Sequence, residues 1–323
     1  MLLRLDNFMD LRTTVRLVMM AVLVCVSGTE VAGKGISLPA ETAPVLRDIY
    51  SGRFNHAIGE ARAMQLKMPE RPLGYLLEAE ASWWKIWCTS AEFKYGMTMP
   101  RHREKLAADQ GYLNLVAKAY SLAEKNLKTQ ETAEMDLYAG MADALAARLY
   151  GLRAENRTAA RAGVRARGYF MRALKLDPSL GDACLGLGLY NYYVDTLSSM
   201  ARVLRFMMGI PGGNKEEGIR LLHRAVEEGE LSSAEARFYL AINLHNYEHR
   251  YEEALESITL LAEKYPENPL FAMARGDLLA KLGRKEQARK SYEAAGAAKL
   301  DDPECQRHVD ALLKESLGAL QRK

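Results

Sequence analysis

The chain has 323 residues, of which 49% are apolar and 26% charged, and its formal net charge is +3. This composition excludes a disordered chain, because it supplies enough apolar residues for a sizeable core. The small net charge argues against a nucleic-acid partner, since a dedicated phosphate binder carries a clear basic excess. Ala, Leu, Glu, Lys and Arg dominate, and alternating β-branched runs are few, so we expect an all-α fold.

The amino terminus is typical of an export signal. Basic residues precede the apolar run 17–26, which is shorter than the ~18 to 20 residues that a bilayer span needs. We predict a signal peptide within residues 1–33, cleaved after Gly28 or after Gly33, with Met9 as an alternative start. Export, most simply to the periplasm, is therefore expected. Retention of the run as a membrane anchor is the alternative.

Three cysteines lie beyond these cleavage sites: Cys88, Cys184 and Cys305. Their number is odd, their spacing is wide, and no C-x-x-C motif occurs. We therefore interpret them as small core residues and not as a disulfide framework.

An internal repeat begins after the signal. In stretches 51–69 and 248–266 an aromatic residue stands three positions before an alanine, and a proline follows that alanine by twelve. The residues are Phe54, Ala57 and Pro69, then Tyr251, Ala254 and Pro266. Stretch 282–300 places Ala288 34 residues after Ala254, and a fourth copy contains Ala166 and Pro178.

This spacing resembles the tetratricopeptide repeat (TPR), a pair of antiparallel helices with a 34-residue unit. The resemblance implies a right-handed α-α solenoid of TPR-like hairpins over about 40–300, with a concave groove that binds a protein or peptide. Residues 301–323 read as an amphipathic capping helix.

Two departures from a plain array stand in the middle of the chain. Segments 103–127 and 132–153 predict helices longer than those of the repeat. After the helix predicted at 181–195, its partner begins only at about Lys215, which leaves an insert at 196–214. Within it, 200–208 predicts a short amphipathic helix that fills the groove or lies on a membrane.

The stretches GLGLYNYY, RFMMGIPGGN and KEEGIRLLHRAVEEG are similar to a TPR subgroup that includes the yeast inclusion-body clearance proteins and bacterial relatives. The similarity covers about 135–275 and implies a non-enzymatic adaptor. Because GIPGGNK lacks the G-K-[ST] ending of a phosphate-binding loop, no cofactor is expected.

Two sets of residues are candidates for partner binding. A basic stripe recurs every fourth residue and suits an acidic peptide or an anionic membrane surface, unless acids on neighbouring helices neutralise it. It consists of Arg153, Arg157, Arg161 and Arg165. Trp83 and Trp87 lie in a predicted long helix, where we expect core packing, with a hot spot in the groove as the alternative. Tyr190, Tyr193 and Tyr239 belong to predicted first helices and suit a groove that grips a peptide.

One stretch raises an enzymatic alternative. His245, Glu248 and His249 form the H-x-x-E-H pattern of inverzincin zinc hydrolases, in which two histidines bind the metal and the glutamate acts as a base. The repeat places His249 at the turn position of Gly52 and Gly283, so the two histidines need not share a helical face. We therefore expect no metal and no catalysis, with the zinc hydrolase as the alternative.

Overall fold

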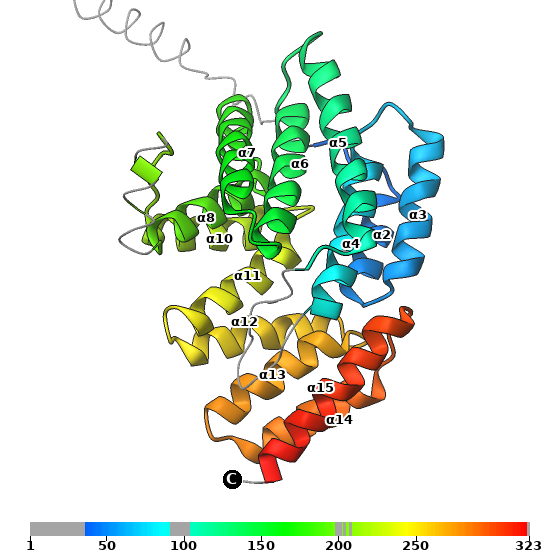
Figure 1. The fold of residues 1–323 in the computed structure, drawn as a ribbon, viewed down its shortest axis with the longest axis vertical. Helices are drawn as coiled ribbons and strands as arrows, with labels where there is room; N and C mark the ends of the chain where they lie inside the picture. Colours follow the sequence, from blue (N-terminus) through cyan, green and yellow to red (C-terminus); the bar gives the residue numbers. More distant parts are fainter. Residues whose placement is uncertain (1–35, 91–103, 198–201, 203–204, 207–208, 322–323) are drawn as a thin grey trace, which may run out of the picture. The chain divides into compact units, whose positions relative to one another are not determined.

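The computed structural model describes residues 36–90, 104–197, 202, 205–206 and 209–321, which form helices joined by loops (Figure 1). Within these ranges no strand occurs. The paired helices are α2 (Thr42–Tyr50) with α3 (Phe54–Lys67), α4 (Leu73–Ser90) with α5 (Ala107–Leu127), α6 (Ala133–Leu152) with α7 (Asn156–Leu176), α8 (Asp182–Asp195) with α10 (Lys215–Glu228), α11 (Ser233–Asn246) with α12 (Tyr251–Lys264), and α13 (Pro269–Lys281) with α14 (Lys285–Ala297), followed by α15 (Pro303–Gln321).

Consecutive helices contact one another along the chain, which confirms the α-α solenoid of TPR-like hairpins with a final capping helix. The matched alanines Ala57, Ala254 and Ala288 are fully buried, so they allow the two helices of a pair to approach closely. Gly283 and His249 both adopt positive φ in the turns, at 76° and 57°. The alignment of His249 with the turn glycines is therefore confirmed.

The predicted long helices are present. α5, α6 and α7 contain 21, 20 and 21 residues, against 14 in each of α11 and α12. Phe170 fixes α7 in place, because its ring packs against Gly140 of α6 and Gly186 of α8. A Cβ at either glycine would come within 2.7 Å or 1.9 Å of that ring. The two glycines are thus needed for the close approach of α7.

Two sequence predictions lie wholly or mostly outside the described residues. The signal peptide at 1–33 is one of them, and the amphipathic helix at 200–208 is described only at Arg202, Arg205 and Phe206. α8 ends at Asp195 and α10 begins at Lys215. In the described part of the chain, no helix has the length and apolar character needed to cross a membrane.

The carboxy-terminal end of the solenoid contacts its beginning. The N-cap residue of α3, Arg53, makes no side-chain cap. Instead the carboxylate of Asp301 accepts hydrogen bonds from the backbone N–H groups of Asn55 and His56, at 3.1 and 2.9 Å. The amide of Asn268 donates to the carbonyl of Tyr50 at 2.8 Å. Residues more than 200 positions apart thus supply each other's backbone hydrogen bonds.

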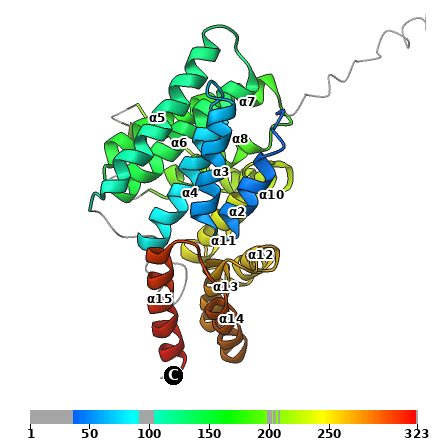
Figure 2. The same cartoon turned by 90° about the vertical axis from the view of Figure 1, so that its right-hand side faces the viewer.

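A disulfide strengthens this contact and corrects the prediction for the cysteines. Cys88 at the end of α4 is bonded to Cys305 in α15, with a Cα–Cα distance of 5.6 Å and a sequence separation of 217. Figure 2 shows the start of α15 beside the end of α4. Only Cys184 behaves as predicted, as a buried free thiol. An odd count misled the sequence argument, because one structural cysteine and one disulfide together also give three.

Candidate functional site

The aromatic residues proposed for the groove are mostly core. Trp83, Trp87 and Tyr239 are 6%, 4% and 8% exposed. The ring of Trp87 lies 5.2 Å from that of Phe238 in α11, and Trp83 lies 6.4 Å from Tyr112 in α5. These rings fill the space between helices, which agrees with the core role expected of Trp83 and Trp87 and contradicts an accessible groove position for Tyr239. Their bulk favours packing between distant pairs over exposure to a partner.

A buried ion cluster lies among these rings, and sequence analysis did not find it. Arg148 of α6 contacts Glu235 of α11 at 2.5 Å and Glu80 of α4 at 3.3 Å. Its guanidinium also lies 5.6 Å from the Trp83 ring centroid and 5.9 Å from that of Tyr239. The cluster therefore joins α4, α6 and α11. The sequence signal that could have indicated this cluster is the presence of Glu80 and Glu235 within largely apolar helices.

Burial and charge set the ionisation of this cluster. Burial raises the pKa of Glu235 to about 8, and the positive charge of Arg148 opposes the shift. Burial disfavours the charge of Arg148, but the two carboxylates outweigh it and hold the pKa of Arg148 above its ordinary value. The Glu80 carboxylate also accepts a hydrogen bond from the indole of Trp84 at 3.0 Å. The charges of the cluster pair with one another, but Arg148 Nη1 and Glu235 Oε1 make no hydrogen bond, so the cluster is held by charge and burial.

The two tyrosines of α8 have different surroundings. Tyr193 donates to the side-chain oxygen of Asn243 in α11 at 3.0 Å, so it belongs to the contact between helix pairs. Tyr190 is half-buried and donates to the carbonyl of Pro211 at 2.8 Å. The guanidinium of Arg167 in α7 lies 5.5 Å from its ring centroid. Tyr190 alone among the predicted aromatics borders the basic helix.

The H-x-x-E-H residues do not assemble as a metal centre. Glu248 accepts hydrogen bonds from Tyr192 and Lys215, at 2.8 and 2.9 Å. His245 is buried at the end of α11 and contacts Asn246, whereas His249 lies in the following turn and contacts Tyr251. The glutamate is thus held by α8 and α10, and the histidines occupy different backbone settings. This arrangement gives no support to the zinc hydrolase alternative.

A different group could in principle hold a cation. Asp48, His56 and Glu60 form the one set of three candidate ligands that converge in the described ranges. The Asp48 carboxylate already contacts the guanidinium of Arg53 and the ring of His56. A neighbouring guanidinium disfavours a metal ion, so this group is better explained as an ion pair that anchors the start of α3.

The predicted arginine stripe divides into paired and unpaired members. Arg153 does not belong to α7, because α6 ends at Leu152 and Ala154 turns the chain with a φ of 61°. The Arg153 side chain is 2% exposed and binds both carboxylate oxygens of Asp109 at 2.7 Å. Arg165 binds Asp143 of α6 with two hydrogen bonds, at 3.1 and 2.5 Å. The prediction that these four arginines form one continuous stripe on a single helix is therefore wrong.

The remaining members lie on the outward side of α7. Arg157 and Arg161 are exposed, and neither makes a hydrogen bond or ion pair with any described residue. Lys175 continues the same side and is also exposed without such a partner. Their spacing of four and fourteen residues places all three near one face of the helix. We call Arg157, Arg161 and Lys175, with the open residues between them, the α7 face.

The middle of the α7 face is open and partly apolar. Gly168 has no atom within 4 Å of the place where a Cβ would stand, so no packing within the described chain requires a glycine there. Glycine in a helix costs about 1 kcal/mol relative to alanine. Met171, one turn further, is 47% exposed. The α7 face thus has unpaired cations toward its ends, and between them Gly168, which has no side chain, and the exposed apolar side chain of Met171.

Comparisons with known proteins concern the fold. No family model and no curated protein matches the chain. Similar solved structures include YrrB, "a TPR protein with an unusual peptide-binding site", at 17% identity over 76% of this chain and 96% of that chain, with a TM-score of 0.32. The C-terminal part of a TPR repeat-containing protein from Cytophaga hutchinsonii is 14% identical over 87% and 96%, with a TM-score of 0.35.

Yeast Tom70 is 13% identical over 85% of this chain and 77% of its own, with a TM-score of 0.33. These structures share a helical-repeat architecture with this chain. At such identities and scores no residue role passes from them to this protein. The roles given below rest on the contacts within this chain.

Proposed function

We propose that the protein is an exported, non-catalytic TPR-type scaffold that binds an acidic segment of a partner protein on the α7 face. One observation carries the proposal: α7 contains basic residues and no acid, and three of them, Arg157, Arg161 and Lys175, are exposed and make no ion pair or hydrogen bond with any described residue. The basic residues are Arg157, Arg161, Arg165, Arg167, Arg172 and Lys175.

Contacts within the chain account for the other three basic residues of α7. Arg165 and Arg172 bind Asp143 and Asp136 of α6, and Arg167 covers the ring of Tyr190. Arg157 and Arg161 are left with a like charge one turn away, which costs a few tenths of a kcal/mol. An acidic partner removes that repulsion and adds charge-assisted hydrogen bonds. The α7 face therefore suits a carboxylate-rich helix or strand.

The helix is well fixed for this role. Phe170 packs between α6 and α8, and Ala162, Ala166 and Ala173 are at most 3% exposed. A rigid element loses little conformational entropy when a partner binds, so charge complementarity is converted into affinity efficiently. The apolar centre at Gly168 and Met171 accommodates an apolar residue of the partner beside its acids. Binding thus needs no rearrangement of the scaffold.

Two features support export and the adaptor role. The Cys88–Cys305 disulfide belongs in an oxidising compartment, as is expected of a chain with the signal-like residues 1–33. The similarity over about 135–275 to the inclusion-body clearance subgroup favours an adaptor without chemistry of its own. We include periplasmic export and this subgroup membership in the proposal. Edman sequencing of the secreted chain would test the first through the position of its new amino terminus.

Charge reversal on the α7 face tests the binding role. The variant R157E/R161E/K175E is compared with K285E/K290E/K314E, which makes the same charge change at exposed lysines of α14 and α15. Both are purified as the mature chain, checked for equal thermal unfolding, and used to capture proteins from cell-envelope extract. A protein retained by the wild type and by the control, but lost by the α7 variant, supports the proposal.

Two outcomes would count against it. Equal retention by all three forms would show that the α7 face is not used. Binding of the wild type to vesicles of anionic phospholipid, lost in the α7 variant, with no protein captured, would instead identify a membrane surface as the partner. Sensitivity to salt is expected in either case, because the arginines are exposed.

A further inference from the structure

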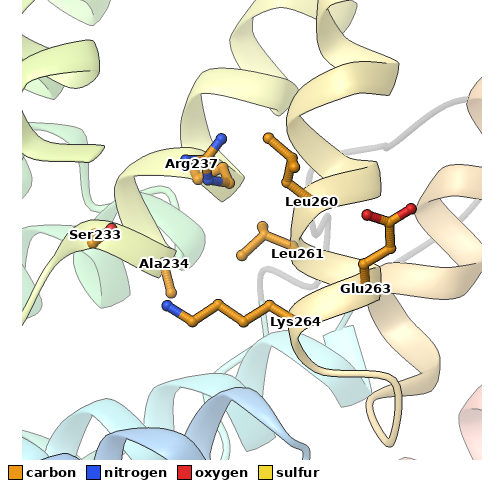
Figure 3. A pocket seen from close by; sticks show the side chains of 7 residues that line it. All are labelled: Ser233, Ala234, Arg237, Leu260, Leu261, Glu263 and Lys264. Atoms are coloured by element: carbon orange, nitrogen blue, oxygen red, sulfur yellow. The ribbon is translucent and has the colours of Figure 1, made fainter. Parts of the chain in front are cut away.

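A cavity of about 420 Å³ lies between α11 and α12, remote in sequence from α7 (Figure 3). Arg237 and Ala234 of α11 line one side, and Leu260, Leu261 and Lys264 of α12 line the other. No function described so far uses these residues. A volume of this order accommodates a small ligand or the end of a peptide.

Arg237 is the unusual residue of this cavity. It is half-buried and makes no hydrogen bond or ion pair with any described residue. Burial lowers its pKa, and the charge of Glu256 offsets this only in part. By contrast, the pKa of the half-buried Arg71 is raised, because its bond to Glu134 outweighs the burial. A desolvated guanidinium without a carboxylate partner is costly, and an anion from outside would relieve that cost.

A second cation points into the same space. Figure 3 shows the ammonium of Lys264 directed across the cavity toward Ala234, whereas the carboxylate of Glu263 is directed away. Lys264 makes no ion pair within the described residues, and its ammonium lies 5.5 Å from the ring centroid of Tyr265. Two cations that make no ion pair within the described residues therefore approach the cavity from opposite helices.

Three apolar residues lie beside the two cations, and Ser233 and Glu263 complete the lining. Leu260 is 44% exposed at the edge, and Leu261 and Ala234 are buried at 1% and 7%. The surface thus offers an apolar contact beside the cations. Because Glu256 already offsets part of the charge on Arg237, a single negative charge balances the site better than the double charge of a phosphate.

We propose that this cavity binds a carboxylate carried by an apolar group, with Arg237 and Lys264 contacting the carboxylate and Leu260 and Leu261 contacting the apolar part. Arginine suits this role because its planar fork binds both carboxylate oxygens. The carboxyl-terminal residue of a peptide and a fatty acid share this chemistry. The site is separate from the α7 face, so either can fail without the other.

The test uses the full mature chain labelled with ¹³C at leucine methyl groups, followed by NMR. Four probes are titrated: octanoate, its neutral analogue octan-1-ol, N-acetylleucine, and its neutral analogue N-acetylleucine amide. We expect at least one of the acids to shift the Leu260 and Leu261 methyl signals, and to bind at least about tenfold more tightly than its neutral analogue. Octanoate alone would assign a fatty-acid site, and N-acetylleucine alone a peptide-terminus site.

Variants locate the charge recognition. R237Q is expected to weaken the binding acid about tenfold, and K264Q severalfold, whereas R220Q on α10 leaves it unchanged. K264Q changes a residue at the cavity edge, so it remains informative if R237Q does not fold. The proposal is overturned if neither acid shifts the two leucines, if acid and neutral analogue bind equally, or if both R237Q and K264Q bind like the wild type.

Discussion

Arg148 on α6 and Arg161 on α7 belong to the same helical hairpin, yet their electrostatic surroundings are opposite. Arg148 contacts two glutamates and two aromatic rings between α4, α6 and α11. Arg161 is exposed and has no described partner. A buried charge requires a partner because water cannot solvate it, whereas an exposed charge can remain unpaired. Pairing therefore marks the charges that hold the fold, and its absence marks those available to a ligand.

The largest difference between the two arginines should appear in stability. R148M leaves Glu80 and Glu235 buried without their cation, and we expect it to lower the free energy of unfolding by about 3–5 kcal/mol. R161M should change it by less than about 0.5 kcal/mol, as exposed substitutions usually do. Urea denaturation followed by circular dichroism measures both. If the free energy of unfolding of R148M stays within about 1 kcal/mol of the wild-type value, the buried cluster does not stabilise the contact between α4, α6 and α11.

The disulfide should have the next largest effect. C88S/C305S releases the link between α4 and α15, which closes a loop of more than 200 residues, and we expect a loss of about 2–5 kcal/mol. Dithiothreitol should lower the stability of the wild type toward that of the double variant and leave the variant itself unchanged. A wild type that is insensitive to the reductant would show that the bond does not form in solution.

Buried acids should make stability depend on pH. Burial raises the pKa of Asp277 to about 7 from its ordinary value of 3.8, although a hydrogen bond from Tyr292 at 2.6 Å opposes the shift. Between these values the folded chain holds a proton that the unfolded chain releases. Stability contributed by this group therefore falls as pH rises from about 4 to 7, by at most ~1.4 kcal/mol per pH unit.

The variant D277N isolates this contribution, because its side chain does not titrate. We expect the stability of D277N relative to the wild type to increase steadily across that pH interval. R161M should instead give a profile parallel to that of the wild type, since arginine does not titrate there. Unfolding midpoints in urea at pH 4 to 8 provide the measurement. A D277N profile parallel to the wild type would contradict the raised pKa.

The smallest effect on stability is expected on the α7 face. R161E replaces repulsion between Arg157 and position 161 by attraction one helical turn apart, which should stabilise the helix by about 0.2–0.5 kcal/mol. The same change should reduce binding of an acidic partner. Thermal unfolding at low and high salt measures the first effect, which should fade as salt screens it. A destabilised R161E would indicate an internal role for Arg161.

Sequence reasoning succeeded for features that repeat locally. Matched alanines predicted the close helix pairs, and the turn position of His249 followed from its alignment with Gly52 and Gly283. The long helices α5 to α7 were also predicted. Each of these depends on residues within one or two turns of the chain, so their spacing alone carries the information.

The candidate site was predicted less well, because side-chain partners lie on other helices. The same four-residue spacing holds for Arg153, Arg157, Arg161 and Arg165, yet Arg153 and Arg165 are paired while the other two make no ion pair with any described residue. The difference depends on Asp109 and Asp143, and the spacing of residues in the sequence does not predict that these acids lie beside the two arginines. The aromatic residues were similarly ambiguous, since a ring that suits a groove also suits a core.

The sequence by itself determined the helix pairs and their order, because small residues, turn residues and prolines act over short distances. Only the tertiary structure decided that Asp301 caps α3, that Cys88 meets Cys305, and that the rings of α4 pack against α11. These contacts join residues that are far apart in the chain, and small rotations accumulated over successive pairs bring them together. The same accumulation left the α7 face outside, with its cations unpaired.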